Sequence, residues 1–184
     1  MTPKAKFQKL RDRFYNFRQQ LQGFPNIHRT FLRSNGYPLD LKNPVTNNQR
    51  IVHKMITDRN PLIPITSDKV QVRDFVRQRL GNQAADDILI PVYHISKTGK
   101  DIPHTQWNHE FFLKANHGSR FNKLIQPGED PKAVAQLATK WLNTSYGQAL
   151  HEWAYRDIPR RILCEKVLRD AKGEIPMDIK LYCY

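Results

Sequence analysis

Residues 110–119, Glu-Phe-Phe-Leu-Lys-Ala-Asn-His-Gly-Ser, combine a short apolar run with one cation and a small polar turn. The apolar half favours a buried strand that carries Lys114 toward its end. The second half, Asn116-His117-Gly118-Ser119, favours a turn whose backbone can approach another molecule closely, because it contains glycine. A lysine beside such a turn suits a phosphate, since the lysine supplies charge and backbone N–H groups supply donors. A solvated lysine at a sheet edge is the alternative that this stretch leaves open.

The composition around this stretch is that of a globular protein. A chain of 184 residues with 39% hydrophobic residues can bury a sizeable core. No stretch is long and apolar enough to span a bilayer, and the N-terminus lacks the apolar centre of a signal peptide. We therefore expect a cytoplasmic protein, with contact to the inner face of the membrane as a further option. Cys164 and Cys183 are too few for a disulfide framework or a structural zinc site.

The net charge of +13 is concentrated near the N-terminus, because residues 1–60 hold 12 Lys/Arg against 3 Asp/Glu. This excess favours either an anionic partner or a solvated basic face. Residues 4–22 predict an amphipathic helix in which an aromatic and leucine stripe alternates with lysine and arginine. We expect the stripe to pack on the rest of the protein, and a position on a membrane surface is the alternative.

Further helices are predicted by caps and periodicity. The Pro/Asn/Gly-rich residues 23–45 indicate an irregular connection. Thr46 is a suitable N-cap for a helix over 47–58, and Ser67 for a helix that ends at Leu80 before Gly81. Lys69 would then lie in a first helical turn, where the helix dipole disfavours a cation.

The second half of the chain mixes strands with one more helix, over 131–144. The predicted strands are 88–93, 110–115, 161–168 and 177–184. Helices that come first, followed by strands mixed with helices, predict an α+β fold with a mostly antiparallel sheet.

Familiar signatures of catalysis are absent from the sequence. It contains no GxxxxGK[ST] phosphate loop, no GxGxxG fingerprint, no HExxH and no GxSxG elbow. The remaining polar candidates are Lys69, Lys114, the 116–119 turn, Glu165, Asp178 and Lys180. Two lysines and the small turn could clamp a triphosphate. A strand such as 162–168 could offer edge backbone groups to a purine.

Four segments from about residue 44 onward carry a family resemblance. Residues 47–51 and 58–61 are similar to a Phe-Asn-Glu-Lys-Ile segment and the Asp-Arg-Asn-Pro-Leu that follows it. Residues 67–76 resemble an Ala-Asp-Lys…Arg-Glu-Tyr-Val helix. Residues 112–119 resemble Val-Leu-Lys-x-Asn-His-Gly-Ser, and 155–180 follow a Tyr-x-x-Ile-Pro…Glu-x-x-Leu…Asp-Tyr-Lys pattern. Together these segments resemble the TupA-like ATP-grasp family, named for a teichuronopeptide biosynthesis protein.

The resemblance implies an ATP site between two subdomains, with Mg²⁺ screening the phosphates. The implied phosphate-binding residues are Lys69, Lys114, Asn116, His117, Gly118 and Ser119. The implied adenine-binding residues are Glu165, Lys166, Val167 and Leu168. Asp178 and Lys180 would face the phosphate or substrate side. The family chemistry is ATP-dependent carboxylate–amine ligation through an acyl phosphate, and the acceptor would be a cell-surface polysaccharide or its peptide decoration.

Two features depart from the family pattern. Arg120 stands where the family has glycine, so we expect either altered loop closure or an added cation on the phosphate. The family's metal-binding residues lie on later strands that this chain does not reach, so no metal ligand is assigned and whether the chain is an active enzyme stays open. The sequence ends on the apolar run Leu181–Tyr184, which predicts an N-terminal part of a longer ligase, with a basic segment 1–45 and a partial ATP-grasp region 46–184.

Two other functions remain alternatives. One is a glycosyltransferase of the same kind of pathway, although the sequence contains no DxD-type metal motif. The other is a non-catalytic basic module that binds anionic lipid or nucleic acid, of which nucleic acid is the less expected partner.

Overall fold

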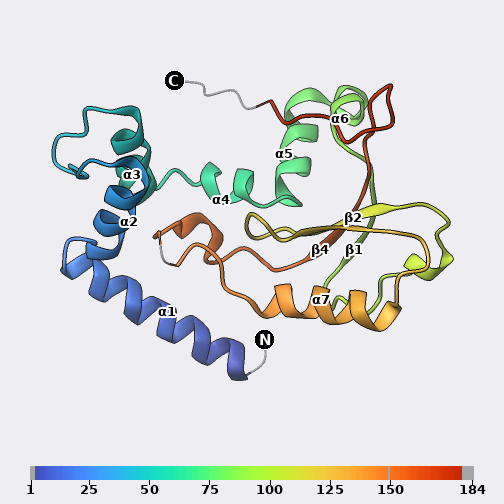
Figure 1. Cartoon of the computed structure of the whole chain (residues 1–184), viewed down its shortest axis with the longest axis horizontal. Coiled ribbons are helices and arrows are strands. Elements are labelled where there is room, and N and C mark those ends of the chain that lie inside the picture. Colours follow the sequence, from blue (N-terminus) through green and yellow to red (C-terminus); the bar gives the residue numbers. More distant parts are fainter. Residues whose placement is uncertain (1–2, 149, 180–184) are drawn as a thin grey trace. The chain divides into compact units, whose positions relative to one another are not determined.

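The computed structural model describes residues 3–148 and 150–179 (Figure 1). The chain divides into two compact units, one formed by residues 1–68 with 143–159 and the other by 69–142 with 160–184. The described residues combine helices with one antiparallel four-stranded sheet, which confirms the predicted α+β class. The expected division at residue 45 stays a prediction.

The first unit is helical. Its elements are α1 (Pro3–Leu21), α2 (Pro25–Asn35), α3 (Asn47–Thr57), α4 (Leu62–Ser67) and the 3₁₀ turn η2 (Trp153–Tyr155). Ile27 and Phe31 of α2 pack with Leu39 and with Ile56 of α3 in a small core. Thr46 and Gln49 form the capping box that opens α3, which confirms the predicted N-cap.

The prediction of an irregular connection over 23–45 is wrong for α2. Pro25 occupies the first turn, where its missing N–H costs nothing, and Gly36 ends the helix in the left-handed conformation. Ile27 and Phe31 are four residues apart, so they share the face that enters the core.

The single helix expected over Ser67–Leu80 is also wrong, because the chain breaks between α4 and α5 (Gln71–Leu80). Ser67 is the last residue of α4 rather than an N-cap. The Lys69 backbone N–H donates to the Asn116 carbonyl at 3.3 Å, which is a long-range bond in place of an intrahelical one. Tertiary structure therefore overrides the local capping signal here.

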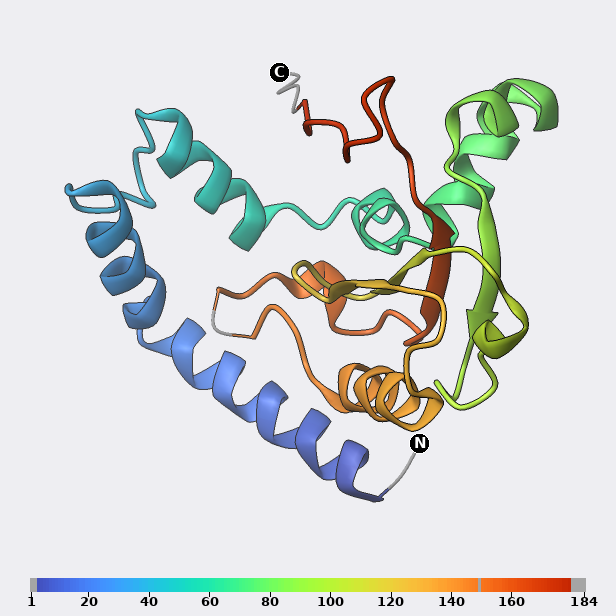
Figure 2. The same cartoon turned by 45° about the vertical axis from the view of Figure 1, so that its right-hand side comes forward.

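The second unit is built on the sheet (Figure 2). Its strands are β1 (Val92–Ser96), β2 (Phe111–Ala115), β3 (Asn122–Ile125) and β4 (Ile162–Lys166), in the order β1-β4-β2-β3. Its helices are α5, α6 (Asn82–Ile88) and α7 (Pro131–Asn143), with the 3₁₀ turn η1 (His104–Gln106). The strand expected at 88–93 starts later because α6, which was not predicted, contains Ile88. β3 was not predicted either.

The two faces of this sheet differ. One face packs on α7, where Leu113, Ala115 and Cys164 meet Val134 and Ala138 in the main core (Figure 2). Side chains alternate along a strand, so the other face carries their neighbours, which include Lys114 of β2 and Glu165 of β4. The fold therefore places both charged residues on the face opposite α7.

Candidate functional site

Lys114 of β2 lies against Glu165 of the neighbouring strand β4. Phe112 stands directly opposite Glu165 in the β2–β4 ladder, and Lys114 is two residues further along the same face. The Lys114 Nζ donates to Glu165 Oε2 at 2.6 Å. The exposed fractions of the two side chains are 23% for Lys114 and 7% for Glu165, so this pair is well shielded from water.

A second cation reaches the same carboxylate from α5. One guanidinium nitrogen of Arg73 lies 3.5 Å from Glu165 Oε1, and another donates to the Ile90 carbonyl. The exposed fractions of the two side chains are 12% for Arg73 and 7% for Glu165. We call Lys114, Glu165 and Arg73 the sheet-face cluster.

The sheet-face cluster has more positive than negative charge, because two cations share one carboxylate. Burial lowers the pKa of Arg73, and the attraction of Glu165 opposes this effect only in part. A poorly hydrated cation that is only partly compensated is electrostatically costly. The cluster is therefore suited to an additional anion.

Lys69 lies beside the predicted phosphate loop. Its side-chain amine donates to the Gly118 carbonyl, in addition to the backbone bond from Lys69 to Asn116. The structure thus brings Lys69 to the loop that directly follows Lys114 and β2.

Two predicted phosphate ligands have their side chains inside the fold. Asn116 and His117 are 0% and 1% exposed. Asn116 holds the ends of β2 and β4 together, because its backbone N–H donates to the Arg161 carbonyl at 3.0 Å and its Oδ1 accepts from the Arg161 N–H at 2.7 Å. These side chains shape the loop, whereas Ser119 and Arg120 are exposed.

Arg120 adopts the backbone conformation that glycine would favour, with φ of 64°. A side chain normally disfavours a positive φ, but Arg120 adopts one here. The loop keeps a left-handed residue here even with a side chain present, which costs about 1 kcal/mol for an L-residue.

The predicted adenine-binding residues begin on an interior strand. β4 lies between β1 and β2, so the expectation of free edge groups over 162–166 is wrong. The Lys166 N–H already donates to the Pro91 carbonyl at 2.9 Å. Val167 is buried and Leu168 is partly exposed just beyond the ladder. The adenine assignment stays a prediction, and it now depends on the backbone after Lys166.

The last two site candidates fall outside regular structure. Residues 177–179 form no strand, so the predicted strand over 177–184 is wrong for that part. Asp178 is exposed, and Lys180 lies outside the described residues. Their expected place on the phosphate or substrate side stays a prediction.

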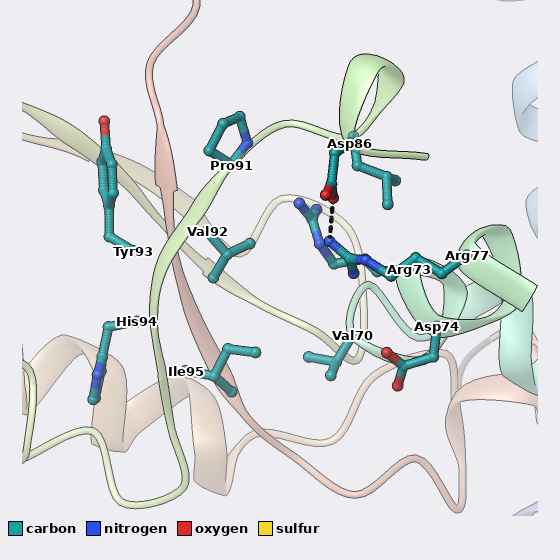
Figure 3. Close-up of a pocket in the computed structure, with 11 residues that line it drawn as sticks. Val70, Arg73, Asp74, Arg77, Asp86, Pro91, Val92, Tyr93, His94 and Ile95 are labelled. Carbon is teal, nitrogen blue, oxygen red and sulfur yellow. Dashed lines mark hydrogen bonds and ion pairs between the residues drawn. The ribbon is translucent and has the colours of Figure 1, made fainter. Parts of the chain in front are cut away.

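A cavity of about 660 Å³ adjoins the sheet-face cluster (Figure 3). Arg73 lines this cavity together with apolar side chains, of which Val92 and Ile95 point inward. Tyr93 and His94 lie on the other side of β1. On the side of the cavity formed by α5 and α6, Arg77 forms an ion pair with Asp86 at 2.8 Å. The carboxylates Asp74 and Asp86 also line this cavity, so its size and its mixture of apolar and charged side chains are those of a small-molecule site.

Sequence reasoning missed Arg73 as a site residue. Arg73 and Arg77 are one helical turn apart on α5, so they share a face soon after Lys69, and this spacing was a signal that could have been used. The Arg73–Glu165 contact joins distant parts of the sequence and could not be deduced from spacing.

Among the described residues, no group of three or more His, Cys, Asp and Glu is positioned to hold a metal ion. Glu165 is already engaged by two cations. The residues present therefore do not fit a Mg²⁺ site, and we assign no step to such a site in this chain.

Comparisons with protein-family models, with curated proteins and with solved structures gave no match to this chain.

Proposed function

We propose that the second unit binds the phosphates of ATP and that the chain is an ATP-grasp protein of the TupA-like kind. The family chemistry would be carboxylate–amine ligation through an acyl phosphate in cell-surface polysaccharide biosynthesis. A cytoplasmic location, where ATP is available, accompanies this proposal. The observation that carries it is the charge of the sheet-face cluster, which has two shielded cations on one carboxylate.

The surplus charge favours ligand binding over a purely structural ion pair. A single ion pair is neutral, whereas a second largely buried cation on the same carboxylate leaves a positive charge that is costly to desolvate unless something compensates it. A triphosphate would supply that compensation through charge-assisted hydrogen bonds. Lys114 and Arg73 keep 23% and 12% of their side chains exposed, so a solute can reach both.

The neighbouring residues complete the proposed phosphate site. The Lys69 amine, now on the Gly118 carbonyl, would transfer to a phosphate oxygen. Loop 116–119 would close over the phosphates, because its first residue, Asn116, is anchored to Arg161 while Ser119 is exposed. The nucleoside would extend toward the cavity beside Arg73 or toward the backbone after Lys166. Any Mg²⁺ would arrive with the nucleotide.

The direct test is calorimetric titration of the full chain with Mg·ATP, with Lys114→Ala as the variant. Loss of one charge-assisted contact to phosphate should weaken binding about 10- to 100-fold. Lys123→Ala is the matched control, because Lys123 lies on β3, pairs with Glu129, and stands opposite Leu113 on the α7 face of the sheet. Binding by this control should change less than about twofold.

Absence of binding at millimolar Mg·ATP would overturn the proposal. So would equal losses in the Lys114 and Lys123 variants, since that result would mean that net charge alone attracts the nucleotide.

A further inference from the structure

The aromatic and leucine stripe of α1 is exposed and does not pack on the other helices of its unit, so the expectation of a packed stripe is wrong for that unit. The exposed fractions of its residues lie between 60% and 74%. The stripe consists of Phe7, Leu10, Phe14, Phe17 and Leu21. At 3.6 residues per turn these five positions fall within an arc of about 80°. A narrow and continuous apolar stripe of this kind normally faces a partner.

The face of α1 that packs on its own unit is the polar one. Asn16 is 7% exposed, and its Nδ2 donates to Gln148 Oε1 at 3.0 Å. Asn26 of α2 donates its backbone N–H to Gln19 Oε1 at 3.1 Å and its Nδ2 to the Tyr15 hydroxyl at 2.8 Å. The usual arrangement of an amphipathic helix is therefore reversed, with polar groups inward and the stripe outward.

Cations border the stripe. The 19 residues of α1 contain six Lys/Arg and one Asp, which gives the helix a net charge of +5. Arg11 and Arg18 fall on one side of the stripe and Arg13 on the other, and all three are exposed. A phenylalanine and leucine stripe with cations on both sides matches a bilayer surface, where apolar side chains enter the acyl boundary and cations meet lipid phosphates.

We propose that α1 lies in the surface of an anionic lipid bilayer, with its stripe inserted and its arginines on the headgroup phosphates. No described helix is long and apolar enough to cross a membrane, so the contact is one of lying on the surface. A nucleic acid would use the cations but would leave the stripe in water. A second copy of α1 would cover the stripe but would bring two helices of charge +5 together. The inference is independent of the proposed ATP site.

The test is co-sedimentation of the full chain with phosphatidylcholine vesicles that contain either no anionic lipid or about one third phosphatidylglycerol. We expect binding to the anionic vesicles, at least tenfold weaker binding to the neutral ones, and weakening as salt rises. Leu10→Ser/Leu21→Ser should weaken binding at least tenfold, because burying an apolar side chain is the main insertion energy. Leu80→Ser/Ile88→Ser is the matched control, since both positions are exposed in helices of the other unit, and it should change binding less than twofold.

Circular dichroism should show that both double variants remain folded. Three results would overturn the proposal. The first is no binding to anionic vesicles, and the second is equal loss in both double variants. The third is a lipid-free dimer that Leu10→Ser/Leu21→Ser dissociates, because a second copy would then be the occupant of the stripe.

Discussion

Glu165→Gln should destabilise the second unit more than Lys114→Met does, although both variants disrupt the same 2.6 Å contact. The glutamine variant leaves two largely buried cations close together with no carboxylate. Removing one partner of a buried ion pair costs about 3–5 kcal/mol, and the partial exposure of Lys114 and Arg73 reduces this to about 2–4 kcal/mol. The methionine variant leaves Arg73 to balance Glu165, so it loses little more than one charge-assisted hydrogen bond, about 1–2 kcal/mol.

The assay is urea unfolding combined with hydrogen exchange at Leu163 and Cys164, two buried positions of β4 that report on the second unit. Inorganic triphosphate should restore stability to Glu165→Gln more than to the natural chain, because the variant has one more uncompensated positive charge. Inorganic triphosphate should restore little stability to Lys114→Met.

An equal or larger cost for Lys114→Met would refute the reasoning. That result would mean that Lys114 and Glu165 form a self-sufficient structural pair and that the cluster has no cation to spare.

Three further predictions concern single residues. Arg120→Gly should raise the unfolding free energy by about 0.5–1 kcal/mol in urea titration by relieving the left-handed backbone, and a loss of stability would show that the arginine side chain itself holds the loop. Burial raises the pKa of the Cys164 thiol to about 12. In a Cys183→Ser background, a thiol reagent at pH 8 should therefore label the folded chain at least about a thousandfold more slowly than the unfolded chain. Rapid labelling of the folded chain would contradict this burial. Burial lowers the pKa of the His151 imidazole, and the positive charge of Arg156 adds to this effect. The neutral imidazole therefore stabilises the fold above its unfolded-state pKa of about 6.5, and this stability is lost as the pH falls below that pKa. Unfolding in urea at pH 7.5 and pH 5.5 should show this loss in the natural chain and a smaller one in His151→Asn, which keeps a residue that tolerates the φ of 56°, and identical losses would exclude His151 as the cause.

Local sequence signals predicted the elements in which neighbours along the chain decide the structure. The capping box at Thr46 and the apolar stripe after Pro131 fix α3 and α7 by short-range contacts. The break around Lys69 could not be predicted this way, because it depends on a bond to the distant Asn116. β3 was missed because it is short and its first residues are polar, so its place is set by pairing with β2.

The candidate site was predictable as a set of residues but not as an arrangement. Lys114 and Glu165 were named separately, and only the β2–β4 register shows that they form one pair. Arg73 was missed because its role depends on the position of α5 relative to the sheet. The family resemblance supplied residue types, whereas the surplus of positive charge became visible only through distances and burial.

The measurement that tests the central claim most directly is hydrogen exchange of the full chain with and without saturating Mg·ATP. The account predicts slower exchange at the amides of residues 118–120 and around Glu165, because phosphates on the sheet-face cluster would order the loop above it. Exchange over α7 should be unchanged, since this helix packs on the opposite face of the sheet. Unchanged exchange at 118–120 under saturating nucleotide, or equal protection across the whole chain, would contradict a phosphate site at the sheet-face cluster.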